Sequence, residues 1–351
     1  MLLNRFIFVN YWFIYIDNKG GWHMFRKTWK TIKVFIIIGV ILICLPHSIL
    51  PIQRDEIVKS ELEKYIKLND NETRLPEFKD NVQALKLKLG QLSIINNSRR
   101  KFNADPVMLD ILASRVANKM CREAAENNFL GHWNTSGEKP YHRYAFAGGF
   151  DHVSENAYGE WSSDNYEVSD TKITLMMKAG HESFMSERAT NDGHKKTVIE
   201  KSHNLVGIGY YLSGKQFRYY EEFIDRYLEF ENIPAEVKVD EAFNITVRTT
   251  DKSFLYFMIV YYEKFPKAML PADISRKGSY GDFTDEEYKT IAAWDLSKYR
   301  NGTSYSIPLK FPKEGLYYIH IYLDKKEITT PGSLNTKGKS PVSGIVIKVV
   351  R

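Results

Sequence analysis

The chain has 351 residues, 43% of them hydrophobic and 26% charged, a composition that excludes wholesale disorder and a length sufficient for two ordinary domains. Residues 1–33 carry nearly all of the net charge of +6, so the remainder is almost neutral and a broad basic surface for nucleic acid is excluded. The two cysteines, Cys44 and Cys121, exclude a disulfide framework.

The N-terminal region has the pattern of an export signal. Four basic residues within 26–33 precede an apolar run at 34–45, which Pro46 ends. This is typical of a secretory signal, because a membrane span needs roughly 20 apolar residues. A retained anchor with its basic side in the cytoplasm stays open, because the run nearly reaches that length if it extends to Ile52. We expect residues 1–52 to form a hydrophobic signal or anchor helix, and the protein to be extracellular or at the cell surface.

Residues 53–90 are charged and helical in character. They are interpreted either as a helical stalk or linker that lifts the next domain from the membrane, or as two ordinary helices of that domain. Further on, Asn103-Ala-Asp-Pro106 predicts a helix start with Asp105 as the cap. Apolar residues then recur at helical spacing and predict a core-facing stripe. Its members are Leu109, Ala113, Val116, Ala117, Met120, Cys121 and Ala124.

A second helix is predicted from residue 173 onward. Its apolar stripe consists of Ile173, Met176, Met177, Gly180 and Phe184. Glu187 lies close to four full turns beyond Ile173 and falls on this stripe, whereas Glu182 falls on the opposite side and is expected in solvent. His181 is about 80° off the stripe, where it either borders a groove or is exposed.

The remaining chain is rich in strand patterns. Residues 205–212 and 217–227 predict a pair of strands around Ser213-Gly214, and Asn232-Ile-Pro234 indicates a boundary. Short aromatic and β-branched runs separated by polar turns then predict a β-sandwich at 235–351. These runs begin at Phe243, Phe254, Tyr305, Leu316 and Gly344. His320, within one of them, is expected to be a packed side chain.

Several motifs between residues 91 and 229 follow one another at characteristic spacing. They are Phe129-Leu-Gly-His132, then Gly137, Pro140, Arg143 and Gly148, Ser154-Glu155-Asn156, Phe184-Met-Ser-Glu187, Asn191-Asp-Gly-His194 and Val206-Gly-Ile-Gly209. In these the chain resembles the CAP superfamily of SCP-like extracellular domains. That superfamily groups cysteine-rich secretory proteins, insect venom antigens, plant pathogenesis-related proteins and many bacterial secreted proteins.

The resemblance implies an α-β-α sandwich with a central groove that holds two histidines and two glutamates. These map onto His132, Glu155, Glu187 and His194, which we call the tetrad. The expected fold class is therefore α+β, with an α-β-α CAP domain at 91–230 followed by an all-β immunoglobulin-like sandwich at 235–351. Phe184 stands where the family often has tryptophan.

The tetrad admits two interpretations. In the first, His132 and His194 hold a divalent metal such as zinc, since imidazole nitrogen and carboxylate oxygen are both suitable ligands. A metal-activated water molecule would then hydrolyse a substrate, and the protein would be a hydrolase. Alternatively, each glutamate accepts a hydrogen bond from a histidine in a polar network without turnover. The sequence has no HExxH motif and no serine or cysteine nucleophile with a matching base, so no catalytic residue is assigned.

The resemblance implies binding rather than catalysis, because no general activity is established for CAP domains. A lipid, sterol, peptide or cell-wall glycan is the expected ligand, and an adhesive role of the β-sandwich is a further alternative. Asn156 is expected to be a structural hydrogen-bonding residue and Arg143 a salt-bridge partner. His142, His152 and His203 are expected at the surface or in loops.

Overall fold

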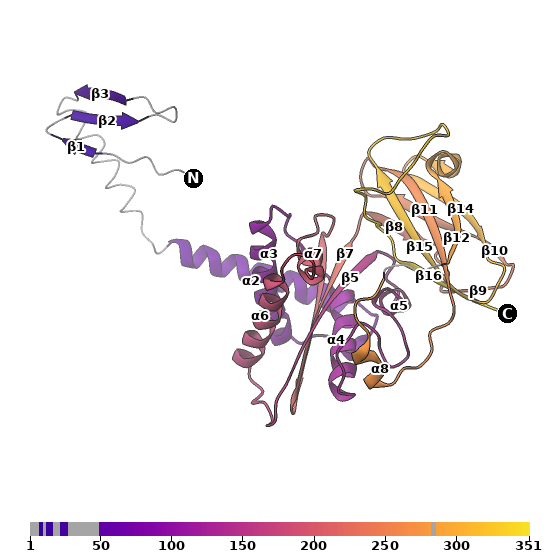
Figure 1. Cartoon of the computed structure of the whole chain (residues 1–351), viewed down its shortest axis with the longest axis horizontal. Coiled ribbons are helices and arrows are strands. Elements are labelled where there is room, and N and C mark those ends of the chain that lie inside the picture. The colour runs from indigo at the N-terminus through magenta and orange to yellow at the C-terminus, as the bar shows by residue number, and fades with distance from the viewer. Residues whose placement is uncertain (1–6, 10–11, 17–21, 27–48, 282–285) are drawn as a thin grey trace. The chain divides into compact units, whose positions relative to one another are not determined.

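The computed structural model describes residues 7–9, 12–16, 22–26, 49–281 and 286–351. It divides into two compact units, residues 1–61 and 62–351 (Figure 1). The first unit contains three antiparallel strands, β1 (Ile7–Val9), β2 (Trp12–Ile16) and β3 (Trp22–Arg26). The apolar run at 34–45, on which the signal or anchor helix is predicted, lies outside the described residues. Within the described residues, no helix combines the length and apolarity that crossing a bilayer requires.

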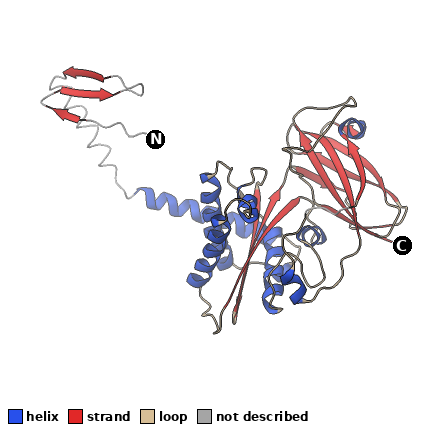
Figure 2. Ribbon diagram, in the orientation of Figure 1, coloured by secondary structure: helices blue, strands red, loops and turns tan. Residues whose placement is uncertain are grey.

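The second unit begins with a four-stranded sheet that has helices on both faces (Figure 2). The strands are β4 (Met108–Leu109), β5 (His152–Trp161), β6 (Leu205–Ser213) and β7 (Gln216–Asp225), in the spatial order β4-β6-β7-β5. The helices are the part of α2 (Ile49–Asn71) from residue 62 onward, α3 (Val82–Lys101), α4 (Ile111–Glu126), α5 (Pro140–Phe146), α6 (Asp170–Ser186) and α7 (Gly193–Ile199), with a 3-10 turn at Pro76–Phe78. The predicted strand pair around Ser213-Gly214 is the β6–β7 hairpin.

Alternating side chains of β7 separate the two faces of this sheet. Phe217, Tyr219 and Phe223 pack in one core with residues of α3, α6 and α7. Tyr220 and Ile224 belong to the opposite face, where they join cores that contain residues of α4 and α5. The sheet is thus the middle of three layers, and the predicted α+β class is confirmed.

The helix α4 begins five residues later than the sequence analysis predicts. Residues 108–109 pair with the start of β6, which requires extended backbone just after the expected helix start. The N-cap is therefore Asp110 and not Asp105, and its carboxylate accepts a hydrogen bond from the Ala113 amide at 2.7 Å. The predicted apolar stripe is confirmed from Ala113 to Ala124, which lie on this helix and are buried, whereas Leu109 is buried on β4 before the helix.

Residues 62–90 pack on the domain and do not form a stalk that stands clear of it. Tyr65 on α2 and Leu85 on α3 are buried in the same core as Phe223. The hydroxyl of Tyr65 also accepts a hydrogen bond from the Leu109 amide at 3.1 Å. Residues 62–90 therefore match the second alternative, helices of the following domain. Most of their charged side chains are exposed, whereas Lys88 of α3 is buried in an ion pair with Asp80.

Two facing sheets form the C-terminal part of the second unit. Their strand orders are β13-β14-β10-β8 and β12-β11-β15-β16-β9. The strands are β8 (Leu228–Glu231), β9 (Glu236–Lys238), β10 (Ala242–Thr249), β11 (Phe254–Glu263), β12 (Glu287–Ala292), β13 (Arg300–Asn301), β14 (Ser304–Lys310), β15 (Gly315–Asp324) and β16 (Ile345–Val350). The helices are α8 (Pro271–Arg276) and α9 (Ala293–Leu296), followed by a 3-10 turn at Ser297–Tyr299. The five strands predicted from the sequence correspond to β10, β11, β14, β15 and β16.

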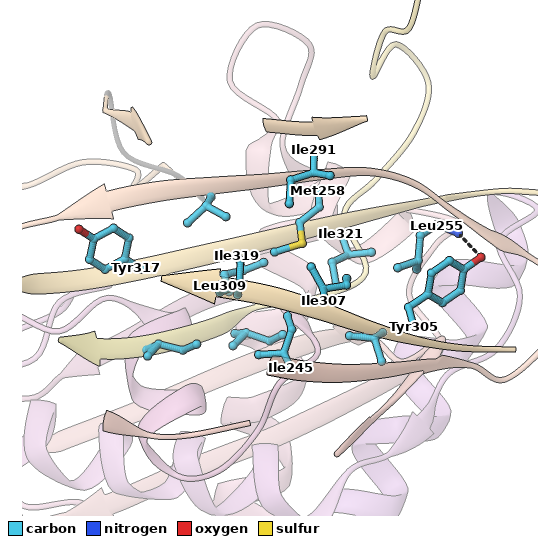
Figure 3. Packing of buried hydrophobic residues seen from close by; sticks show 14 of the residues in the cluster. Ile245, Leu255, Met258, Ile291, Tyr305, Ile307, Leu309, Tyr317, Ile319 and Ile321 are labelled. Atoms are coloured by element: carbon cyan, nitrogen blue, oxygen red, sulfur yellow. Dashed lines mark hydrogen bonds between the residues drawn. The ribbon is translucent and has the colours of Figure 1, made fainter. Parts of the chain in front are cut away.

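The two sheets share one apolar core (Figure 3). Ile245 and Ile307 of one sheet pack with Met258 and Ile319 of the other, and all four are fully buried. The structure places the start of this sandwich earlier than predicted, because β8 pairs with the end of β10 and so belongs to it. His320 is buried on β15, as expected for a packed side chain.

Two glycines of β6 allow α4 to pack directly on the sheet. A Cβ at Gly207 would lie 2.5 Å from the Cβ of Ala113, and a Cβ at Gly209 would lie 2.5 Å from that of Ala117. Such distances are far below van der Waals contact, so any larger residue would push the helix away. These glycines therefore set the spacing of two layers of the fold.

We expect Gly209→Ala to lower the free energy of unfolding by about 1–3 kcal/mol, because the added methyl group overpacks the contact with α4. Gly90→Ala is the matched control, since it lies within α3 and has no atom within 4 Å of an added Cβ. That variant should be neutral or stabilised by up to about 1 kcal/mol. Urea unfolding of the two variants measures both values, and equal stabilities would contradict the close packing.

Candidate functional site

A cavity of about 740 Å³ lies beside β5 and is lined by all four tetrad residues. Glu155 comes from β5 and His132 from the segment that follows α4. Glu187 lies at the end of α6 and His194 at the start of α7. Segments far apart in the sequence therefore converge on this hollow, which we call the tetrad cavity.

The histidine His132 is held by a buried ion pair. Its Nδ1 lies 2.7 Å from Oε1 of Glu155, while Arg143 donates to Oε2 of the same carboxylate and to the carbonyl of His132. Burial, together with the positive charge of Arg143, lowers the pKa of His132 to about 4. At neutral pH the imidazole is uncharged, so Nδ1 donates to Glu155 and Nε2 carries the lone pair. Arg143 is thus a structural salt-bridge partner, as expected.

A second buried acid, Glu222, adjoins this pair and was not singled out from the sequence. It lies on β7 directly opposite Glu155, with its Oε1 3.7 Å from the Arg143 guanidinium. Burial and the neighbouring charge of Glu155 raise the pKa of Glu222 well above its usual range. The neutral form of Glu222 is therefore favoured beside Glu155, so one guanidinium balances one negative charge. The sequence signal for it is the acidic pair Glu221-Glu222 flanked by aromatic residues within β7.

The other glutamate, Glu187, reaches the cavity from the cap of α6. The helix ends at Ser186, and Glu187 has φ −57° and ψ 143°, so the helical spacing that predicted its inward direction does not extend to it. Its Oε1 lies 2.5 Å from Nδ1 of His194, and its Oε2 accepts the His194 amide at 3.0 Å. Glu187 thereby caps α7 and orients the imidazole. Glu182 is exposed, as predicted.

The two imidazoles of the tetrad face a common space. Their ring centroids are 6.4 Å apart. Each Nδ1 is bound to a glutamate, so Nε2 is the nitrogen left for a ligand, and no described residue hydrogen-bonds to it. Phe184 stacks on His194 at 5.1 Å, and Tyr280 packs on His132 at 4.7 Å. Each ring is therefore fixed by a carboxylate on one edge and an aromatic side chain on one face.

The side chain of Asn156 is buried at the wall of the tetrad cavity. Its Nδ2 donates to the carbonyl of His194 at 3.0 Å, in agreement with a structural role. Its Oδ1 has no hydrogen-bond partner among the described residues. Asn156 therefore supports the cavity wall, while its unpartnered oxygen is itself buried.

The expectation that His142, His152 and His203 lie at the surface or in loops is wrong for His142 on α5 and His152 on β5, which are buried. His203 lies in the loop before β6, as expected, but it is buried as well. The Nε2 atom of His142 lies 3.0 Å from Glu263. His152 and His203 share the two carboxylate oxygens of Asp225. Their carboxylate partners are distant in the sequence, so no local pattern indicates that these rings are paired and buried.

The expectation for His181 is also wrong, because this side chain is buried away from the tetrad cavity. Its Nδ1 lies 2.8 Å from Glu221 on β7, and its Nε2 lies 2.9 Å from Oγ of Ser98 on α3. A position 80° from the apolar stripe is still covered here, because α3 packs beside α6 and supplies a hydrogen-bond partner.

We expect a pH-dependent contribution of His132 to stability. In the unfolded chain its pKa is near 6.5, whereas in the fold it is about 4, so between these values only the unfolded state binds the proton. The free energy of unfolding therefore decreases as the pH falls through this window. Relative to His132→Gln, the natural protein should lose about 2 kcal/mol more between pH 7 and pH 4.5. Urea unfolding at both pH values measures the difference, and parallel pH profiles would contradict a buried neutral imidazole.

Comparisons with known proteins give structural likeness only. No protein-family model matches the chain, and no curated protein matches it. Among solved structures, it is similar to an extracellular protein containing an SCP domain from Bacillus anthracis, with 16% identity, a TM-score of 0.31, and coverage of 39% of this chain and 40% of that one. It is also similar to an outer surface protein from Borrelia burgdorferi, with 16% identity, a TM-score of 0.30, and coverage of 40% and 93%. The chain thus spans less than half of the length of the Bacillus protein.

Proposed function

We propose that the protein is an exported, non-catalytic binding protein that recognises its ligand in the tetrad cavity. The observation that carries this proposal is the pair of imidazoles whose Nδ1 atoms are bound to glutamates and whose rings line one open hollow. The basic and apolar pattern of the N-terminal region supports export. The three-layered part supports assignment as a CAP domain, and the two facing sheets support an immunoglobulin-like sandwich.

Binding is favoured over hydrolysis because the acid groups of the cavity are already engaged. A general base must reach the proton that it abstracts. Glu155 accepts hydrogen bonds from His132 and Arg143, and Glu187 caps α7 while it holds His194. Neither carboxylate is therefore poised to activate a water molecule.

Two potential nucleophiles also lack access to a substrate. Burial raises the pKa of the Cys121 thiol well above its usual range, which disfavours the reactive thiolate. Ser98, His181 and Glu221 form a hydrogen-bonded row with the order of a nucleophilic triad. However, Ser98 does not line the tetrad cavity, and a catalytic serine needs space for a substrate beside it. This row is a polar network in which His181 and Glu221 are buried and Ser98 is half-buried.

A divalent metal such as zinc fits the cavity in part. His132 and His194 would hold it through Nε2, and Glu155 and Glu187 would orient these rings from the second shell. No cluster of three or more potential ligands occurs among the described residues, so water or the bound ligand would complete the coordination. When bound, the ion would supply an electrophilic contact for an oxygen atom of the ligand.

We expect zinc titration of the full chain, followed by calorimetry, to reveal binding that is lost in His132→Ala and in His194→Ala. Glu187→Gln should lower the affinity about 10–100-fold, because it removes the charge that orients His194. Glu182→Gln is the matched control, as it alters an exposed carboxylate of the same region. Loss of stability in the histidine variants without any zinc binding by the natural protein would instead favour a purely structural network.

The binding role itself is tested by a screen of the full chain against lipid vesicles, peptides and cell-wall glycans. A ligand of the tetrad cavity should bind the natural protein and bind His194→Ala more weakly. Equal binding of a ligand by both proteins would place recognition elsewhere and contradict the proposal.

A further inference from the structure

The C-terminal part of the second unit forms one wall of the tetrad cavity. After β11 the chain passes through α8 and places residues 277–280 at the cavity. Ile274 on α8 is fully buried in a core shared with α4. The hydroxyl of Tyr280 accepts a hydrogen bond from the Glu155 amide at 2.8 Å, and its ring packs on His132. The wall is thus tied both to the core and to the tetrad.

Two further hollows continue from the tetrad cavity. The middle hollow, of about 270 Å³, shares Ser154, Lys196 and Thr197 with it. The outer hollow, of about 500 Å³, shares Ser202 and Ser340 with the middle one. Neighbouring hollows that share walls form a row, so a ligand longer than the tetrad cavity can continue from one to the next.

In the middle hollow, a buried carboxylate holds two imidazoles. His203 Nδ1 lies 2.7 Å from Oδ1 of Asp225, and His152 Nδ1 lies 2.9 Å from Oδ2. Although burial acts in the opposite direction, the charges of His203 and His152 hold the pKa of Asp225 well below its usual range, so it is ionised at neutral pH. His203 lines the hollow while its Nδ1 is engaged, which repeats the arrangement of the tetrad.

The connection between β15 and β16 closes the middle and outer hollows from the sandwich side. Lys339 and Ser340 line both hollows. Lys339 is anchored, because its Nζ lies 2.5 Å from Asp324 at the end of β15. Both ends of the row therefore use residues of the sandwich, and the site is complete only when the two parts are packed together.

The lining of the row favours a ligand rich in hydroxyl groups. Hydroxyl-bearing residues occur in every hollow. Examples are Tyr280 in the tetrad cavity, Ser154 in the middle hollow and Tyr227 in the outer hollow. Leu323 and Val342 line the outer hollow and Leu130 the tetrad cavity, but apolar side chains do not form the continuous lining that a lipid chain needs. Sugar hydroxyls, like those of serine, both donate and accept hydrogen bonds and match such walls.

A peptide ligand is disfavoured because the edge of β5 is already hydrogen-bonded at the cavity. An extended peptide gains affinity by adding to the free edge of a sheet. β5 pairs with β7 on one side only, but at the cavity its outward amide at Glu155 already donates to Tyr280. The segment from the sandwich therefore occupies the position that a peptide strand would need.

We propose that the three hollows form one extended binding site, built jointly by both parts of the second unit, and that its ligand is an extended glycan chain. This inference rests on the proposed function and adds the ligand class and the role of the sandwich. The tetrad cavity holds one end of the chain, and the middle hollow with His203 holds units further along.

An array of linear oligosaccharides, from disaccharides to decasaccharides, tests the proposal with the full chain, and calorimetry measures the affinity of the best series. Affinity should rise with chain length. Ser340→Trp, which fills the far hollows, should weaken the longest oligomer about tenfold or more and leave the disaccharide unchanged. Ser333→Trp is the matched control, because it lies exposed in the same connection and lines none of the three hollows.

A second variant, Thr197→Arg, narrows the junction between the tetrad cavity and the middle hollow. It should also abolish the increase in affinity with oligosaccharide length. Long oligomers that lose affinity in His194→Ala but not in these two variants would overturn the extended site while the proposed function stands. Oligomers that bind equally well to His132→Ala and His194→Ala would overturn the proposed function as well. Binding of peptides or vesicles, but no oligosaccharide, at the same residues would overturn the glycan class.

Discussion

The tetrad cavity depends on the buried ion pair between Arg143 and Glu155. This pair joins α5 to β5, and the same guanidinium binds the carbonyl of His132 and so fixes the segment after α4. A buried pair of this kind adds little net stability, but loss of one partner typically costs about 3–5 kcal/mol because the other charge is left uncompensated. The neighbouring Glu222 stays protonated for the same reason. The balance of charge among the buried groups Arg143, Glu155 and Glu222 therefore determines the geometry of the site.

The same chemical unit, an imidazole held by a carboxylate through one ring nitrogen, occurs several times in this protein. What differs is the surroundings of the other nitrogen. At His181 this nitrogen lies 2.9 Å from the hydroxyl of the half-buried Ser98, away from the tetrad cavity, and the unit is a polar network. At His132 and His194 the rings line a hollow, and the unit can contact a ligand. The position of the ring in the fold, and not its pairing, separates a structural histidine from a candidate binding residue.

The two parts of the second unit are packed as one body around the site. Tyr141 of α5 stacks on Tyr318 of β15 with ring centroids 4.1 Å apart, and Ile274 of α8 is buried beside α4. Tyr280 then contacts both His132 and the backbone of Glu155. The sandwich is therefore an integral part of the cavity wall, and a change in its packing would alter the tetrad directly.

The sequence by itself determined the α+β class, the apolar stripe of α4, five strands of the sandwich and the four residues that meet in the cavity. The fold class, the stripe and the strands follow from periodicity, which is a local property, whereas the four cavity residues are those that the resemblance to the CAP superfamily implies. Only the tertiary structure decided that residues 62–90 are packed, that α4 starts after a short strand, and that His142, His152 and His203 are buried. It alone also revealed Glu222 and Tyr280, because their partners lie far away in the sequence. Burial and the pairing of charges are properties of contacts between distant segments, and no local pattern encodes which segments will meet.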